Sequence, residues 1–187
     1  DYITKHDSQE QTTKKAKDST LIVLGSGNLG LIYLTQWNRR LYYEEMVSLF
    51  PNLIPGLVKH QGIGFILVDS FTNGPMVIGE DGIYYLNNDK IVGKNPLENF
   101  GENAPMHLKR HNSFKHMPDI LVNSFYNPEN EEICAFEELI GSHGGLGGSQ
   151  TRPFILYPSD WKDPGELIGA KSIYDFLKEE LNNLKNS

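Results

Sequence analysis

The sequence has very little cysteine, no long apolar run and no excess of basic residues. Cys134 is the only cysteine among the 187 residues, so the chain forms no internal disulfide and has no zinc site of the CxxC type. No run of eighteen apolar residues occurs, so we expect no membrane contact from this segment. The 24 acidic side chains outnumber the 17 basic ones, for a formal net charge of -7. This charge disfavours nucleic acid as a partner.

The composition that remains is typical of a soluble globular protein, with 39% apolar and 22% charged residues. The length suits one domain, or a large part of one. Residues 1–19 are mostly polar and are expected to form a flexible tail or linker, and residues 20–187 are expected to form a single α/β domain. No signal peptide is recognised and the first residue is Asp1, which suggests a piece of a longer protein. The sequence fits both a cytoplasmic and a membrane-tethered parent.

Short apolar runs rich in strand formers alternate with segments of helical periodicity. Strands are expected at 20–24, 31–35, 64–71, 75–79, 83–86, 91–92, 119–125 and 153–157. Helices are expected from residue 41 to the region of Pro51, over 103–111 and over 171–185, with Ser172 as the cap of the last one. This order predicts an α/β fold, in which a layered sheet with flanking helices carries a small β-hairpin or meander insertion.

The segment Gly25–Gly30 matches the G-x-G-x-x-G pattern of dinucleotide-binding proteins. That motif works because a helix begins within it and directs free N–H groups at a pyrophosphate. The residues that follow, Leu31–Thr35, have the pattern of a strand. A tight glycine bend between two strands is therefore favoured over nucleotide binding, which stays open as an alternative.

His107 and His111 lie four residues apart on an expected helix, as in some zinc sites. The residues between them include Lys109 and Arg110 and no glutamate. A solvated basic face is therefore favoured over a metal site.

His143 lies in Gly141–Gly148, which contains five glycines in eight positions. So many glycines are entropically costly to order unless a positive φ or a close backbone approach requires them. A histidine in such a loop lies next to any ligand that binds there. The residues alone do not decide between a binding loop and a flexible surface loop.

Several short motifs resemble one known family. They are Gly-Ser-His-Gly-Gly at 141–145 ahead of an apolar segment, together with 26–30, 55–58, 62–65, 119–126 and 135–138. Together they resemble the carboxy-terminal half of bacterial proteins of the alkaline phosphatase superfamily, in its type I phosphodiesterase and nucleotide pyrophosphatase branch. The similarity covers about residues 19–161. It implies an alkaline-phosphatase-like domain and a phosphate ester substrate.

The resemblance implies two divalent metal ions, usually zinc, and a Thr or Ser nucleophile. His143 would be one metal ligand, with Ser142, Gly144 and Gly145 shaping the loop. Arg152 is a candidate for neutralising substrate phosphate or for a salt bridge that holds the loop. Asn28 is a candidate for lining the same cleft or for a turn role.

The other ligands of that family do not appear in the sequence. No histidine has an aspartate four residues before it, and none follows an aspartate directly. No Thr or Ser stands in a recognisable nucleophile setting. A two-metal centre needs several donor groups, so we expect this chain alone to be inactive and to bind no metal tightly. The sequence thus predicts a carboxy-terminal fragment whose partner is the amino-terminal catalytic half of the same polypeptide. A non-catalytic binding or structural module derived from that fold is the alternative.

Overall fold

The computed structural model describes residues 20–138, 141 and 143–186. The expected tail at 1–19 lies outside this part of the chain. The chain forms two compact units, which divide between Arg152 and Pro153. Each unit is described by itself below.

The first unit is built on a seven-stranded sheet in which every neighbouring pair is antiparallel. The order across the sheet is β1-β2-β7-β3-β4-β5-β6. Its strands are β1 (Ile22–Ser26), β2 (Leu29–Tyr33), β3 (Ile63–Ser70), β4 (Gly74–Ile78), β5 (Gly82–Tyr85), β6 (Lys90–Gly93) and β7 (Ile120–Ser124). The short strands β8 (Tyr126–Asn127) and β9 (Glu132–Ile133) form a separate two-stranded sheet. The expected mixed α/β fold with a layered sheet is confirmed at this level, and the meander β4-β5-β6 continues the main sheet.

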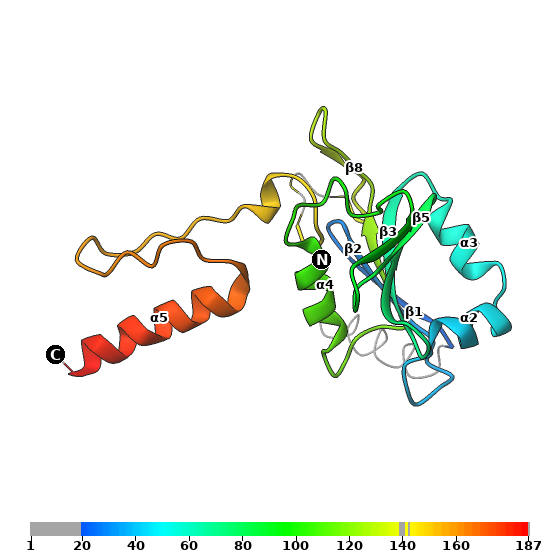
Figure 1. The fold of residues 1–187 in the computed structure, drawn as a ribbon, viewed down its shortest axis with the longest axis horizontal. Helices are drawn as coiled ribbons and strands as arrows, with labels where there is room; N and C mark the ends of the chain where they lie inside the picture. The colour runs from blue at the N-terminus through cyan, green and yellow to red at the C-terminus, as the bar shows by residue number, and fades with distance from the viewer. Residues whose placement is uncertain (1–19, 139–140, 142, 187) are drawn as a thin grey trace, which may run out of the picture. The chain divides into compact units, whose positions relative to one another are not determined.

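Helices cover both faces of the sheet (Figure 1). α2 (Tyr43–Leu49) and α3 (Leu53–Val58) pack on one face, and α4 (Ala104–Asn112) packs on the other. Pro51 separates α2 from α3, as the sequence predicts, because proline does not continue a helix. A 3-10 turn, η1 (Ser149–Thr151), ends the first unit.

β3 and β7 form the centre of the sheet and are buried on both faces. Ile66 and Val68 belong to the core beneath α2 and α3, whereas Phe65 and Leu67 belong to the core beneath α4. Successive side chains of a strand point to opposite faces. The continuous apolar run at 64–71 therefore has the pattern of a strand covered on both sides, and that prediction is confirmed.

Buried or paired carboxylates hold the connections around this core. The Asp119 carboxylate, just before β7, accepts the N–H groups of Leu34 at 2.7 Å and Leu41 at 2.6 Å. At the start of α2, Glu45 pairs with Arg39 at 2.5 Å and accepts the N–H of Tyr42 at 2.9 Å. These contacts lower the pKa of Glu45 to about 2. Glu45 thus supplies the half of a capping box that bonds to the N–H of the residue before the helix, while Tyr42 makes no side-chain cap bond.

The second unit contains one long helix, α5 (Gly169–Asn186). Phe176 of this helix is buried and stacks edge-on against Tyr157 and Trp161, with ring centroids 5.4 Å and 5.9 Å away. Lys171 forms an ion pair with Asp175 one turn later. No helix in the described part of the chain is both long and apolar enough to cross a membrane.

Two local predictions are wrong. The segment 153–157 is not a strand, and Phe154 and Leu156 are 93% and 91% exposed. A strand needs a pairing partner as well as an apolar pattern, and no described segment pairs with it. Ser172 is not the cap of α5, because the helix begins at Gly169 and the Ser172 hydroxyl donates to the carbonyls of Ile168 and Gly169.

Candidate functional site

A two-residue turn, Gly27–Asn28, joins β1 to β2 and forms the floor beneath the glycine-rich loop. The two strands are paired from Ser26 and Leu29 outward. Gly27 has φ of +59°, which suits glycine at the first position of a two-residue hairpin. The predicted glycine bend between two strands is thus confirmed. No helix begins in Gly25–Gly30, so the geometry that binds a pyrophosphate is absent there.

The glycine-rich loop lies directly on this turn. The carbonyl oxygen of His143 accepts the N–H of Asn28 at 2.9 Å. A Cβ on Gly27 would lie 2.1 Å from that same oxygen. Main chain therefore covers the face of the turn on which a phosphate would have to bind in a nucleotide site.

Asn28 is fully buried and fastens the loop through its side chain. Its Oδ1 accepts the N–H of Gly145 at 2.8 Å, and its Nδ2 donates to the carbonyl of Leu146 at 2.9 Å. Its own carbonyl accepts the N–H of Ser124 on β7 at 3.0 Å. Asn28 thus links the turn to the loop and to the central sheet. This is the structural one of the two roles that the sequence left open for Asn28.

A second buried amide, Asn123 at the end of β7, holds the loop from the other side. Its Oδ1 accepts the N–H of Leu146 at 2.7 Å, and its Nδ2 donates to the carbonyl of Leu146 at 3.1 Å. Asn123 lies opposite Leu29 in the sheet, next to Asn28. It is not among the site residues predicted from the sequence. The available signal is an amide in an otherwise apolar strand, because a buried amide needs hydrogen-bond partners.

Gly144 and Gly145 have no room for a side chain. Gly144 has φ of +91°, and a Cβ there would lie 2.5 Å from the carbonyl oxygen of Ser26. A Cβ on Gly145 would lie 2.6 Å from Oδ1 of Asn123 and 2.9 Å from the Asn28 amide. Close backbone approach is one of the two reasons for glycine that the sequence analysis considers.

The segment before the loop closes the free side of the turn. Phe136 donates its N–H to the carbonyl of Gly27 at 2.7 Å, and the carboxylate of Glu137 accepts the N–H of Gly27 at 2.5 Å. Both residues are exposed. Glu137 is a second residue to which the sequence analysis assigns no role, and its carboxylate is the acidic group bonded to the floor of this loop.

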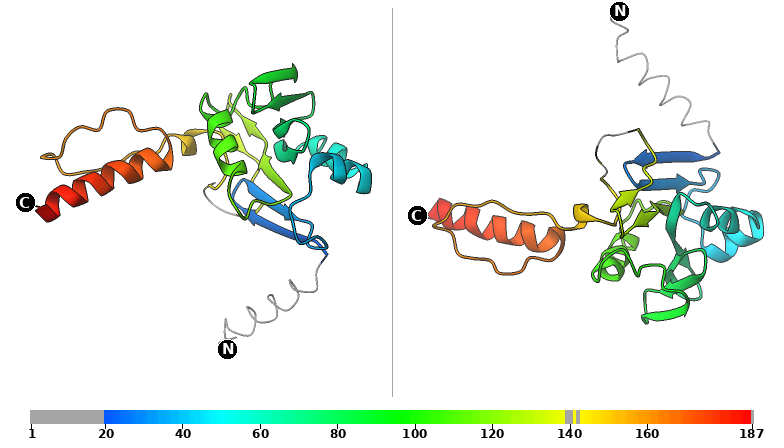
Figure 2. Two further views of the ribbon diagram at one scale, coloured as in Figure 1. Left: turned by 60° about the horizontal axis from the view of Figure 1, so that its bottom comes forward. Right: turned by 90° about the horizontal axis from the view of Figure 1, so that it is seen from above.

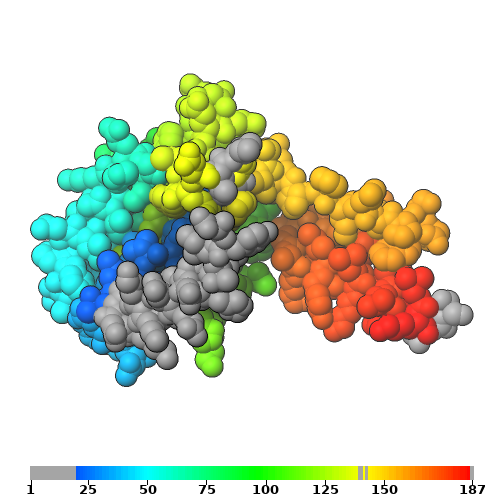
Figure 3. All heavy atoms as spheres, turned by 180° about the vertical axis from the view of Figure 1, so that it is seen from behind, coloured from blue at the N-terminus to red at the C-terminus, as the bar shows by residue number. Residues whose placement is uncertain are grey.

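His143 itself is exposed. Its main chain is bonded to Asn28 as described. The yellow part of the first unit is visible in the space-filling view of Figure 3. Ser142 lies outside the described residues. Arg152 is also exposed, and its main-chain N–H donates to Ser149 at the end of η1. No ion pair joins the Arg152 side chain to the loop within the described part of the chain.

A complete metal centre is not present among residues 20–138, 141 and 143–186. No three His, Cys, Asp or Glu side chains there lie close enough together to hold a metal ion. His107 and His111 on α4 therefore belong to no such group among the described residues.

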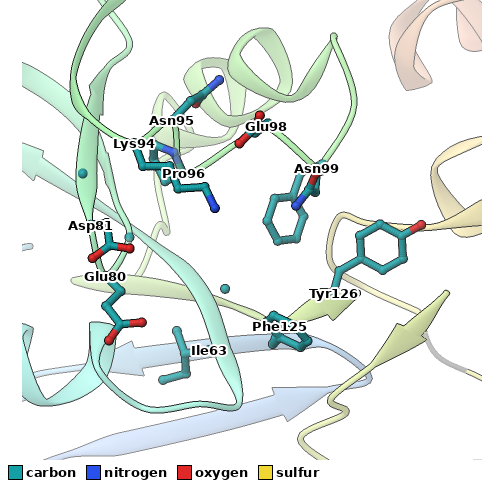
Figure 4. A pocket seen from close by; sticks show the side chains of 14 residues that line it. Ile63, Glu80, Asp81, Lys94, Asn95, Pro96, Glu98, Asn99, Phe125 and Tyr126 are labelled. Carbon is teal, nitrogen blue, oxygen red and sulfur yellow. The ribbon is translucent and has the colours of Figure 1, made fainter. Parts of the chain in front are cut away.

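Two cavities lie away from His143. The first, of about 180 Å³, is lined by Glu80, Asp81, Lys94 and Glu98 among others, with Lys94 between the acidic side chains (Figure 4). The second, of about 300 Å³, is lined by residues near the start of β7 and by Arg40. Neither contains the glycine-rich loop.

Acidification is expected to destabilise the first unit through His111. Burial lowers the pKa of His111, and the positive charges of Arg110 and His107 lower it further. The folded state thus binds a proton at His111 less readily than the unfolded state. The contribution of His111 to the free energy of unfolding is therefore present above the ordinary histidine pKa near 6.5 and is lost as the pH falls through the folded pKa. We expect the urea midpoint of unfolding to decrease as the pH is lowered from 7.5 to 5. His111→Gln should reduce the slope of the midpoint against pH. An unchanged slope would contradict this assignment, and the exposed His116→Gln is the control.

Comparisons of this chain with protein-family models, with curated proteins and with solved structures found no match.

Proposed function

We propose that this chain is the carboxy-terminal portion of a metal-dependent phosphoric ester hydrolase of the alkaline phosphatase type, to which it contributes one metal ligand, His143. The observation that supports this most is the way the loop is held. Two buried amides, Asn28 in the β1–β2 turn and Asn123 at the end of β7, fix the main chain at Gly145 and Leu146, while His143 stays exposed.

A fixed backbone beneath an exposed histidine suits metal coordination. A ligand must be held within a fraction of an ångström of its productive position, and hydrogen bonds from the surrounding shell provide that precision. Asn28 and Asn123 are therefore positioning residues in this proposal, and neither contacts the substrate.

The roles of the other residues follow from their chemistry. His143 would donate an imidazole nitrogen, and the two divalent metals, zinc by preference, would polarise the phosphoryl oxygens and activate the attacking group. Arg152 is exposed on the same unit and would pair with a phosphate oxygen of the ester. The nucleophile and the remaining ligands would come from the amino-terminal catalytic half, outside the described residues.

Uncovered apolar surface supports a missing half. β1 forms one edge of the sheet (Figure 2), and its neighbouring residues Val23 and Leu24 are both exposed although they point to opposite faces. In the second unit, Phe154 and Leu156 are almost completely exposed in an unpaired segment. A finished domain would bury surfaces of this kind.

A non-catalytic module with the same fold is the second candidate. It is favoured by the lack, among the described residues, of any cluster that could hold a metal on its own. This second candidate also has the fixed loop, but in it the His143 imidazole has no role. Nucleotide binding at Gly25–Gly30 is not proposed, because that turn is a hairpin covered by the main chain of His143.

The test uses the full polypeptide read from the gene, including the sequence upstream of Asp1, loaded with zinc. Hydrolysis of bis(p-nitrophenyl) phosphate is expected, and His143→Ala should lower kcat/KM by more than about 100-fold, since loss of a ligand is expected to exceed the effect of losing a supporting residue. His107→Ala, on α4, is the matched control and should leave the rate unchanged. The 187-residue chain alone should bind zinc weakly and below one ion per chain.

Three results would contradict this proposal. A start codon immediately ahead of Asp1 would favour the non-catalytic module. Full activity of the His143→Ala protein would show that His143 is not a metal ligand of the active centre. Tight binding of two metals by the 187-residue chain would show that the chain holds a complete centre by itself.

A further inference from the structure

α5 carries an apolar stripe whose side chains are about half exposed. Tyr174, Leu177, Leu181 and Leu184 are between 42% and 58% exposed. Their spacing of three, four and three residues is that of alternating a and d positions in a coiled coil. Phe176, which packs against Tyr157 and Trp161, falls at position c of the same heptad, on a different side of the helix. Within the second unit, Lys178 lies over the Tyr174 ring, 5.3 Å from its centroid, while Leu177 and Leu181 of the stripe stay partly exposed.

The charges beside the stripe complement those of a second, parallel copy. With Tyr174 and Leu181 at a, Glu180 falls at g and Lys178 and Lys185 fall at e. In a parallel pair, each g residue faces the e residue five positions later on the other helix, which brings Glu180 next to Lys185 of the second chain. In an antiparallel pair, e faces e, and lysine would face lysine. Leucine at both d positions also suits a two-stranded pair.

We propose that α5 is a self-association surface through which two copies of this chain form a weak, parallel coiled-coil dimer. This inference does not depend on the proposed function. The stripe spans only two heptads, so the dimer is expected to dissociate on dilution, because short helices are marginal without a large interface.

Sedimentation equilibrium of the 187-residue chain tests the association. We expect a mass near 21.2 kDa at low micromolar concentration, rising toward twice that value by roughly 500 µM, the range of a weak interface. Leu181→Asp should keep the chain monomeric, with circular dichroism confirming that the helix is retained. A monomer at every concentration would overturn the proposal, and so would a dimer that survives Leu181→Asp.

Charge exchange tests the register without removing apolar contacts. Glu180→Lys alone and Lys185→Glu alone should each shift the dimer toward monomer, and the double variant Glu180→Lys/Lys185→Glu should restore it. If all three variants dimerise to the same extent as the native chain, the parallel arrangement is contradicted.

Disulfide trapping gives an independent geometric check. In a Cys134→Ser background, which removes the native exposed thiol, Leu177→Cys at position d should form an intermolecular disulfide on mild oxidation. Glu179→Cys at position f faces away from the partner and should not. Equal cross-linking of the two would overturn the proposed interface.

Discussion

Gly27→Ala is expected to destabilise the first unit by about 3 kcal/mol and to detach the glycine-rich loop from the β1–β2 turn. Two costs combine at this position. An L-residue at φ of +59° is strained by about 1 kcal/mol or slightly more. A Cβ there would also lie 2.1 Å from the carbonyl oxygen of His143 and 2.7 Å from its nitrogen. Since both neighbours are main chain, the loop has to move, and the hydrogen bond between Asn28 and His143 is lost.

Two matched glycines separate these costs. Gly101 has φ of +93° but nothing within 4 Å of a built Cβ, so Gly101→Ala should show the strain alone, about 1 kcal/mol. Gly56 lies within α3 with open space and no positive φ, so Gly56→Ala should be neutral or stabilise by up to about 1 kcal/mol. Urea unfolding of the three variants measures the differences. If Gly27→Ala costs no more than Gly101→Ala, the loop does not lie on the turn as described.

Asn28→Ala is expected to destabilise the unit by about 2 to 4 kcal/mol. The substitution removes the acceptor of the Gly145 N–H and one donor to the Leu146 carbonyl, and leaves the Gly145 N–H without its partner. The Leu146 carbonyl keeps its bond from Asn123, which limits the loss. Asn28→Asp should also be destabilising, because it places a carboxylate at a fully buried position without restoring the donor.

Amide hydrogen exchange locates this effect. In the native chain the N–H groups of Gly145 and Leu146 should be protected, since each is bonded to a buried amide oxygen. Asn28→Ala should abolish protection at Gly145 and reduce it at Leu146. The exposed Asn38→Ala is the control and should change neither stability nor exchange by a measurable amount. Unchanged protection at Gly145 in Asn28→Ala would contradict the role assigned to this side chain.

Much of the fold can be predicted from the sequence, because its main signals are local. The apolar run at 64–71 predicts β3, and Asp81-Gly82 predicts the turn between β4 and β5. The same holds for the bend at Gly25–Gly30, whose strand-like continuation argues against a nucleotide motif. In each case the turn residues and the adjoining apolar pattern lie within about a dozen positions of one another.

The errors come from features that depend on distant partners. The segment 153–157 has the composition of a strand, but strand formation depends on a neighbour that composition does not specify. The last helix begins two residues earlier than expected, so Ser172 lies inside it, where its hydroxyl bonds back to the preceding turn.

The candidate site shows the same division. The glycine content of 141–148 is a local signal and draws attention to His143. The amides that hold the loop lie 117 positions away for Asn28 and 23 for Asn123. Their role depends on β2 and β7 lying side by side, which brings both amides to the loop.

The most direct test of the proposed role of His143 is a crystal structure of the full polypeptide grown with zinc, with anomalous data collected at the zinc edge. The account predicts an anomalous peak about 2.0 to 2.1 Å from an imidazole nitrogen of His143, the usual distance for zinc bound to histidine. It also predicts that Asn28 and Asn123 stay bonded to the loop. Zinc bound elsewhere, with the His143 ring free in solvent, would contradict it.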